Sequence, residues 1–363
     1  MPCVPISALD AQRWQGTSPA IAHGLQENTR SAGQMDPPKN MAAPVTVVFA
    51  RYPPDESAMR TLSHSDGALA SVNSFQASPI PAANVASVPQ RSLFRYPGGK
   101  TWLVPHIREW FKYLGEKPRL LIEPFVGGGI VSLTAVMENL VENCLLCELD
   151  RDVAALWQAS LCSGPELHRR IRQFKPTREA VNRIACSQGK SVVDRGFRTL
   201  VLNRTRRGGI LSRGTSLLRA GENGRGLASR WYPDTLEDRL ANIRHHADRI
   251  EFRHTDGMEV LESQLDSAEN SVVFVDPPYT LGGKQAGRRL YKHHDIDHEH
   301  LFGILSEAGA EFLMTYDDSP EIAELVRKHH FHAVTVEMKT THHRRINELV
   351  ITRNAVFDVR IRR

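Results

Sequence analysis

LLIEPFVGGGIVSLTAV, the stretch from Leu120 to Val136, is the most informative part of this 363-residue chain. An apolar run ends at an acid, three consecutive glycines follow, and a helix-compatible segment comes next. Glycine lets a backbone turn sharply and approach a ligand closely, as in the strand–turn–helix start of a nucleotide-binding α/β sheet. The turn lacks the last glycine of the GxGxxG dinucleotide pattern, so it favours a mononucleoside ligand.

Short apolar runs alternate with helix-length segments on both sides of this stretch, from about Phe94 onward. The alternation predicts a mostly parallel sheet with helices on both faces. The last two runs are too close for a crossover helix, so we expect an antiparallel hairpin at one edge. The expected strands are Leu120–Glu123, Cys144–Glu148, Ile250–Arg253, Ser271–Val275, Phe312–Thr315, Ala333–Met338 and Leu349–Thr352.

Acids end or follow two of these strands. Glu148 comes about 20 residues after the glycines, where a carboxylate can accept both hydroxyls of a ribose. Asp256 follows the third strand, where it could meet an adenine amino group. Taken alone, Asp256 fits better as an ordinary helix N-cap.

Asp276, Pro277, Pro278 and Tyr279 follow the apolar run SVVFV, at the carboxyl end of an expected central strand. The motif suits a planar exocyclic amine, which becomes nucleophilic when its N–H groups donate to two acceptors. The Asp276 carboxylate and the Pro277 carbonyl can supply both, and the two prolines fix the direction of that carbonyl. The Tyr279 ring offers a face on which an extruded base can stack.

Positive charge gathers in one segment of the chain. The whole sequence carries only +5, but residues 195–230 hold nine arginines, no lysine and the single acid Glu222, which gives +8. Guanidinium groups pair bidentately with phosphates and with guanine, so this window predicts a DNA-reading subdomain inserted between the second and third strands. We expect Trp231 and Tyr232, which close the window, to be core anchors.

The rest of the composition excludes several classes of protein. Residues 1–90 hold 11 of the 21 prolines without a hydrophobic period, which predicts a mostly disordered extension. No run approaches the roughly 18 apolar residues of a membrane span, and five cysteines do not suggest a disulfide framework. We therefore expect a cytoplasmic protein. Cys144 and Cys147 form a lone CxxC, which predicts core residues rather than a zinc site. We expect the histidines clustered near residues 293–300 and 329–343 to be solvated or to face DNA.

Together these motifs resemble the adenine-specific DNA methyltransferases of the Dam-like class. The resemblance spans about Phe94 to Asn354 and involves four segments in a characteristic order. These are FRYPGGK (94–100), the upstream element; EPFVGGG (123–129), the first cofactor motif; DPPY (276–279), the catalytic motif; and NELVITRN (347–354), the closing strand.

The resemblance implies a Rossmann-like α/β fold: a seven-stranded S-adenosylmethionine-dependent methyltransferase sheet at residues 91–160 and 248–363, with a small, mainly helical target-recognition insert at 161–247. It implies direct methyl transfer from S-adenosylmethionine to the exocyclic amino group of adenine in double-stranded DNA, with base flipping. The enzyme would be a bacterial or phage-encoded monomer that needs no metal. The catalytic residues implied are Asp276, Pro277, Pro278 and Tyr279, and the cofactor-binding residues are Tyr96, Lys100, Phe125, Gly127, Gly129, Glu148, Asp256 and Asp276.

LVLNRTRRGGILSRG (200–214) resembles the family's target-recognition segment and implies DNA contacts by Asn203, Arg204, Arg206, Arg207 and Arg213. Arg206 and Arg207 replace an aromatic residue that family members often carry there, so the recognition sequence stays open. So does the presence of an accompanying restriction enzyme.

Three other functions also stay open: methylation of the cytosine exocyclic amine, methylation of RNA or protein, and DNA binding by a decayed enzyme. Asp276 favours adenine over the first two, where Ser or Asn is usual. The intact set of Lys100, Gly127, Glu148 and Asp276 argues against decay.

Overall fold

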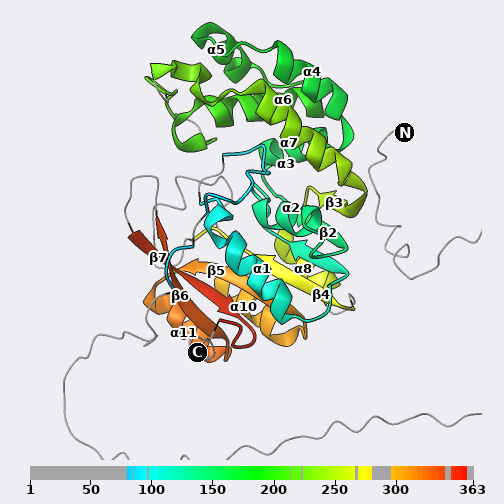
Figure 1. Cartoon of the computed structure of the whole chain (residues 1–363), viewed down its shortest axis with the longest axis vertical. Helices are drawn as coiled ribbons and strands as arrows, with labels where there is room; N and C mark the ends of the chain where they lie inside the picture. Colours follow the sequence, from blue (N-terminus) through cyan, green and yellow to red (C-terminus); the bar gives the residue numbers. More distant parts are fainter. Residues whose placement is uncertain are drawn as a thin grey trace, which may run out of the picture. The chain divides into compact units, whose positions relative to one another are not determined.

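The computed structural model describes residues 80–83, 85–95, 98–212, 214–221, 224–265, 269–279, 296–339 and 345–357. The strands form one seven-stranded sheet in the order β3-β2-β1-β4-β5-β7-β6 (Figure 1). β7 is antiparallel to both β5 and β6, and the other neighbouring strands are parallel. The predicted fold class and the antiparallel edge hairpin are therefore confirmed.

All seven predicted strands are present. They are β1 (Leu120–Glu123), β2 (Asn143–Cys147), β3 (Ile250–Arg253), β4 (Ser271–Val275), β5 (Glu311–Asp317), β6 (His332–Lys339) and β7 (Arg345–Thr352). Three strands have the predicted first and last residues. The largest difference in bounds is at β7, which begins four residues before its predicted start at Leu349. Its polar first half pairs with β6 over its full length, so Glu348 lies inside the sheet and not in a loop.

Helices cover both faces of the sheet, as the alternating pattern predicted. The helices are α1 (Val104–Tyr113), α2 (Ile130–Met137), α3 (Arg151–Cys162), α4 (Gly164–Gln173), α5 (Arg178–Cys186), α6 (Val192–Thr205), α7 (Pro233–His245), α8 (Gly257–Gln264), α10 (His298–Glu307) and α11 (Pro320–Lys328). Alternate strand residues point to opposite faces. Leu121 belongs to a core shared with α1, α2 and α3, whereas its neighbour Ile122 belongs to a core shared with α8, α10 and α11.

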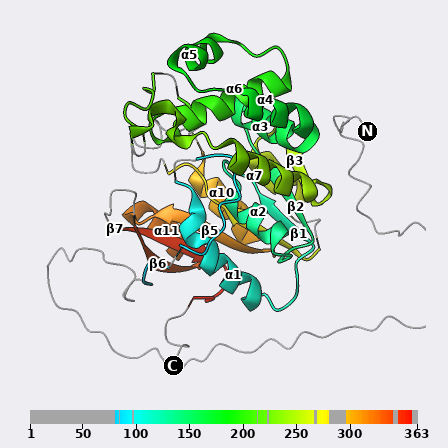
Figure 2. The ribbon, with the colours of Figure 1, turned by 45° about the horizontal axis from the view of Figure 1, so that its top comes forward.

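The segment between β2 and β3 is helical, and α4 to α7 gather on one side of the sheet (Figures 1 and 2). Its apolar residues join the core of the α1–α3 face. Gly196 of α6 allows a close approach to α3, because a Cβ there would lie 2.7 Å from the Ala155 carbonyl oxygen. Trp231 is a core residue, 5% exposed, as predicted, but Tyr232 is 36% exposed, so its assignment to the core is wrong.

Residues 1–79, most of the predicted disordered extension, lie outside the described residues. The boundary predicted at residue 90 is too late, because residues before it already pack on the fold. The Ile80 N–H donates to the Thr335 carbonyl oxygen at 2.8 Å, beside edge strand β6. Val88 is 5% exposed within the core. In the parts of the chain that the structure describes, no helix is long and apolar enough to cross a membrane.

Candidate active site

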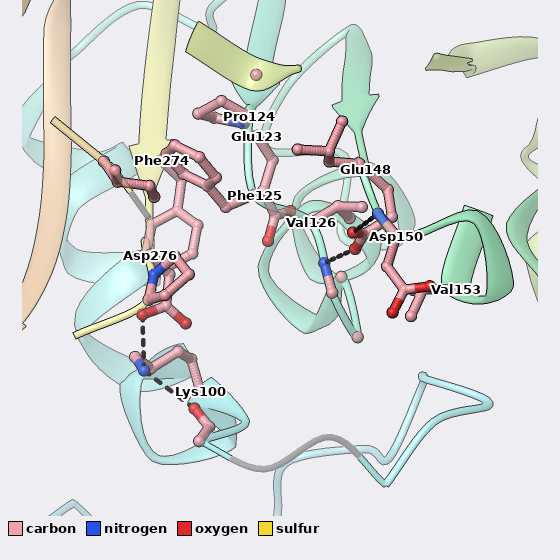
Figure 3. Close-up of a pocket in the computed structure, with 18 of the residues that line it drawn as sticks. Lys100, Glu123, Pro124, Phe125, Val126, Glu148, Asp150, Val153, Phe274 and Asp276 are labelled. Atoms are coloured by element: carbon pink, nitrogen blue, oxygen red, sulfur yellow. Dashed lines mark hydrogen bonds and ion pairs between the residues drawn. The ribbon is translucent and has the colours of Figure 1, made fainter. Parts of the chain in front are cut away.

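A cavity of about 290 Å³ lies at the carboxyl edge of the sheet (Figure 3). The carboxyl ends of parallel strands meet at this edge, so residues that are distant in sequence converge there. Of the predicted site residues, the cavity is lined by Lys100, Phe125, Gly127, Gly129, Glu148, Asp256, Asp276 and Pro278. Tyr96 lies outside the described residues.

The glycine turn between β1 and α2 forms one wall. Gly127 and Gly129 have φ angles of 44° and 62°, in the left-handed region that favours glycine. A Cβ on Gly129 would lie 2.5 Å from the Trp157 ring, whose Nε1 donates to the Gly127 carbonyl oxygen at 2.9 Å. The indole therefore holds the turn from behind and leaves its other side to the cavity.

Glu148 follows β2 and faces this turn. Its Oε2 accepts from the Gly127 N–H at 3.2 Å, and its Oε1 accepts from the Asp150 N–H at 2.8 Å (Figure 3). Desolvation raises the pKa of Glu148 to about 7, against the opposing effect of these backbone N–H groups. A carboxylate oxygen can accept more than one hydrogen bond, so both oxygens can also take ligand hydroxyls.

Asp256 caps α8, as its sequence context favoured, because its side chain accepts from the Met258 N–H at 2.9 Å. It lines the cavity as well. The next residue, Gly257, packs tightly on the loop after β1, since a Cβ there would lie 2.1 Å from the Pro124 carbonyl oxygen. The cap and the close contact place Asp256 on a well-held loop.

Asp276 follows β4 and is held by three donors. Its Oδ1 lies 2.9 Å from Lys100 Nζ and accepts from the Tyr279 hydroxyl at 3.0 Å and the Thr315 hydroxyl at 2.9 Å. Lys100 begins a short 3₁₀ helix (Lys100–Leu103), and its side chain is only 4% exposed. The upstream FRYPGGK element thus meets the DPPY motif through an ion pair.

The Tyr279 ring is already in contact with other side chains. It stacks on Tyr316 at 5.5 Å between centroids, and Lys100 Nζ lies over it at 5.2 Å. Burial raises the pKa of Tyr279 well above its ordinary value, so the phenol keeps its proton and donates to Asp276. Stacking of a target base on this ring stays a prediction.

Sequence reasoning missed two buried acids in this region. Glu123 ends β1, lines the cavity and accepts from both the backbone N–H and the hydroxyl of Ser132. Desolvation raises its pKa to about 8. Glu348 on β7 faces Lys100 and Tyr279. Glu123 could have been found, since it stands beside the glycine motif. Glu348 could not, because its position depends on the register of β7.

The prediction that Asn203 and Arg204 contact DNA is wrong, because their side chains are 0% and 4% exposed. Asn203 Oδ1 accepts from the Arg95 N–H at 2.8 Å, and its Nδ2 donates to the Gly209 carbonyl oxygen at 2.8 Å. Arg204 Nε donates to the Leu93 carbonyl oxygen at 3.0 Å. These side chains tie the upstream element to the insert.

The other arginines of the basic window also differ in their surroundings: some are held by protein groups and others are exposed. Arg206 donates to the Leu211 carbonyl oxygen at 2.8 Å and so holds the insert loop in place. Arg195 forms an ion pair with Asp152 at 3.0 Å. Arg207 is exposed, as a DNA contact requires, and Arg213 lies outside the described residues. The charge of the window therefore overstates the number of arginines that are available to DNA.

The insert loop nevertheless reaches the cavity. Gly209, Leu211 and Ser212 line it together with the residues of the catalytic sheet. Gly209 has a φ of 75°, and a Cβ there would lie 2.1 Å from the Arg95 carbonyl oxygen. Glycine is thus required where the insert crosses the upstream element.

Cys144 and Cys147 are core residues, as predicted. They point to opposite faces of β2, which is why each belongs to a different hydrophobic core. Burial raises the pKa of the Cys147 thiol to about 12. Within the described ranges, no group of three or more His, Cys, Asp or Glu side chains is placed to hold a metal ion.

The histidine clusters are only partly described. His298 is buried in α10, with Nδ1 2.7 Å from the Tyr316 hydroxyl, so its expected solvated position is wrong. His300 lines the cavity, and its Nε2 lies 2.6 Å from Glu262 Oε1. His293, His294, His342 and His343 lie outside the described residues.

Comparisons with known proteins identify the family of the chain. The family model for D12 class N6 adenine-specific DNA methyltransferases matches residues 96–341. A DNA N-6-adenine-methyltransferase of Escherichia phage P1 is 30% identical over 245 residues, which cover 65% of this chain and 31% of the phage protein. The chain thus spans about a third of the length of that relative.

Two solved structures show a weaker likeness. The rRNA methyltransferase aviRa of Streptomyces viridochromogenes has a TM-score of 0.32 and 15% identity, covering 70% of this chain and 86% of its own. A precorrin-6y C5,15-methyltransferase of Geobacter metallireducens has a TM-score of 0.28 and 9% identity, covering 68% and 85%. Both scores lie below 0.5, so the assignment rests on the family model, whose match covers more than half of the chain. The chain belongs to the D12 class of N6 adenine-specific DNA methyltransferases.

Proposed function

We propose that this chain transfers a methyl group from S-adenosylmethionine to the exocyclic amino group of adenine in double-stranded DNA. The observation that carries the proposal is one cavity in which the DPPY carboxylate of Asp276, the glycine turn and Glu148 face the same space. Family membership supports the same activity. In the cell, such an enzyme would work where DNA is, in the cytoplasm of a bacterium.

The cavity fits a nucleoside cofactor. Its volume of about 290 Å³ is near the lower end of the roughly 300–1,000 Å³ of small-molecule sites. Gly127 and Gly129 would let the ligand approach the backbone, Glu148 would accept the ribose hydroxyls, and Asp256 would face the adenine amino group. When bound, S-adenosylmethionine would supply an electrophilic methyl group. Phe125 would pack against the cofactor as part of the same wall.

Asp276 would act on the target amine. A carboxylate oxygen that accepts a hydrogen bond from the adenine amino group favours a tetrahedral nitrogen with an available lone pair. The Pro277 carbonyl would accept the hydrogen bond from the second N–H of that group. Pro278 would hold that carbonyl in place. Transfer would be direct, because the amine itself is the nucleophile and no enzyme nucleophile is needed.

The target base would have to leave the duplex. Asp276 lines the cavity at the carboxyl edge of the sheet, and enzymes that act on a base inside DNA extrude it from the duplex to reach their active site. The insert, residues 161–247, would read the DNA, with Arg207 on a phosphate or a base edge. The segment before residue 161, from residue 80 onward, and residues 248–363 would form the catalytic domain. We expect a monomer.

Expression in a bacterial host that lacks adenine methylation tests the proposal. Single-molecule sequencing of the host genome should show N6-methyladenine in one sequence context with the wild-type chain and none with Asp276→Ala. Glu324→Ala, which removes an exposed acid on α11, outside the insert and the cavity, is the control and should methylate normally. Modified cytosine, or no modification by a chain that binds S-adenosylmethionine, would contradict the proposal.

A further inference from the structure

The donors around Asp276 are distributed unevenly between its two oxygens. Lys100, Tyr279 and Thr315 all contact Oδ1, at 2.9 to 3.0 Å. Among the described residues, no donor is placed on Oδ2. Figure 3 shows one oxygen of Asp276 meeting the Lys100 amine and the other turned away from it. The carboxylate is therefore held in one orientation by a single oxygen, and the other oxygen can accept from a ligand.

Two of these three donors also face a second carboxylate. Glu348 Oε2 lies 3.7 Å from Lys100 Nζ and 3.5 Å from the Tyr279 hydroxyl. The Glu348 side chain is 8% exposed and that of Lys100 is 4% exposed, so neither charge is fully solvated. One buried ammonium is thus shared by two carboxylates.

The position of Glu348 follows from the sheet topology. β7 is antiparallel to β5, and Glu348 is paired with Asp317 at the end of β5. The first half of β7 therefore reaches the same edge as the carboxyl ends of β4 and β5. Burial raises the pKa of Glu348, and the nearby Lys100 ammonium opposes that rise.

Sharing the ammonium has a chemical consequence. Lys100 Nζ also donates to the Gly98 carbonyl oxygen at 3.0 Å, but a lysine with Asp276 as its one carboxylate partner could still move over that carboxylate and neutralise the oxygen that the target amine needs. Glu348, which is not among the residues that line the cavity, attracts the same ammonium and so opposes its movement onto Oδ2. The same carboxylate lies 3.5 Å from the Tyr279 hydroxyl, whose single proton is donated to Asp276 at the shorter distance of 3.0 Å.

We propose that Glu348 is a positioning residue for methyl transfer, which holds Lys100 and Tyr279 on Oδ1 of Asp276 and so keeps Oδ2 for the target amine. This inference rests on the proposed function. Glu348 would not touch the substrate; it would act only through the two donors.

Glu348→Gln tests the inference, because glutamine keeps the size and an acceptor oxygen but loses the charge. The assay is single-turnover transfer of a tritiated methyl group from S-adenosylmethionine to unmethylated plasmid DNA, with the full-length chain between pH 6 and 10. We expect the rate constant to fall at least about tenfold, a loss of about 1.4 kcal/mol in transition-state stabilisation. The Kd for S-adenosylmethionine should stay within about twofold, since Glu348 does not line the cavity.

The pH profile separates positioning from a merely structural role. Three groups face the Lys100 ammonium: Asp276 and Tyr279, which belong to the DPPY loop, and Glu348, which belongs to β7. Glu123, at the end of β1, lies near Asp276. Removal of one carboxylate makes Lys100 lose its proton more easily. The rate constant of Glu348→Gln should therefore fall at a lower alkaline pH than that of wild type, which moves the alkaline limb of the pH–rate profile to lower pH.

Three further variants complete the test. Glu348→Asp keeps the charge and should keep the alkaline limb near its wild-type position. Thr315→Val removes a donor without changing charge, so it should lower the rate and leave the limb unshifted. Glu324→Gln, an exposed acid on α11, should behave as wild type.

Three results would overturn the inference, and two of them are a wild-type rate in Glu348→Gln and the same alkaline shift in Glu348→Asp and Glu348→Gln. A slow Glu348→Gln enzyme with an unshifted profile would also overturn it, since lost packing alone explains that result. If the wild-type chain binds S-adenosylmethionine but methylates no DNA, the proposed function itself fails.

Discussion

The pH dependence of stability should report the buried acid at the end of β1. Glu123 is 3% exposed, and desolvation raises its pKa from 4.5 to about 8. A carboxyl group with a raised pKa binds more protons in the folded state than in the unfolded state. Its contribution to stability is therefore complete below about pH 4.5 and is lost as the pH rises toward 8.

The size of the effect follows from the same two values. Integration of the linkage relation between pH 5 and pH 7 gives a loss of about 2.5 kcal/mol in the free energy of unfolding from Glu123 alone. Glu123→Gln removes this titration and keeps an oxygen that can accept from Ser132. The free energy of unfolding of the variant, relative to wild type, should therefore rise by about 2.5 kcal/mol over this pH range.

Urea unfolding of both full-length proteins at pH 5, 6 and 7 measures this difference. Groups that titrate in both proteins, Glu148 among them, cancel when the two curves are subtracted. Glu324→Gln serves as a surface control, and its curve should run parallel to that of wild type. If the difference between Glu123→Gln and wild type stays constant with pH, the carboxylate is ionised in the folded protein and the reasoning about its burial is refuted.

Four other changes probe the cofactor wall and the insert. Glu148→Ala should weaken binding of S-adenosylmethionine at least about tenfold in titration calorimetry, since hydrogen bonds to a charged group are worth about 1.5–3 kcal/mol; unchanged affinity would remove Glu148 from the site. Gly129→Ala should destabilise the fold by about 1–3 kcal/mol in urea, because its φ of 62° and the Trp157 ring both oppose a Cβ; wild-type stability would contradict this. Arg207→Ala should lower the salt slope of DNA binding, measured by fluorescence anisotropy, by about 1 without loss of stability, whereas Asn203→Ala should destabilise by about 1–3 kcal/mol. The opposite pattern would restore Asn203 as a DNA contact.

The sheet and much of the cavity could be predicted from local pattern. Apolar runs of strand length, separated by helix-length segments, were enough to predict all seven strands and both helical layers. Parallel strands bring their carboxyl ends to one edge, so residues that follow strands were expected to meet there. Glu148, Asp256 and Asp276 do line one cavity, and Lys100, which follows no strand, joins them there from the upstream element.

The insert was harder to interpret, because composition does not reveal burial. Nine arginines in one window indicated a surface for DNA, yet Arg204 is buried against the Leu93 carbonyl oxygen and Arg195 pairs with Asp152. Both partners are distant in sequence. An arginine that serves the fold and one that serves a ligand look alike until the surrounding backbone is placed.

Local sequence pattern thus determined the type of sheet, the glycine turn, the acids at the strand ends and the family, since each depends on residues that are neighbours in the chain. Packing decided which arginines remain exposed, that Asn203 joins the upstream element to the insert, and that Glu348 shares Lys100 with Asp276. Those contacts depend on strand register and on the approach of segments far apart in sequence. The pattern of neighbouring residues predicts neither the register nor the approach of distant segments. Both are selected by the free energy of packing in the assembled core.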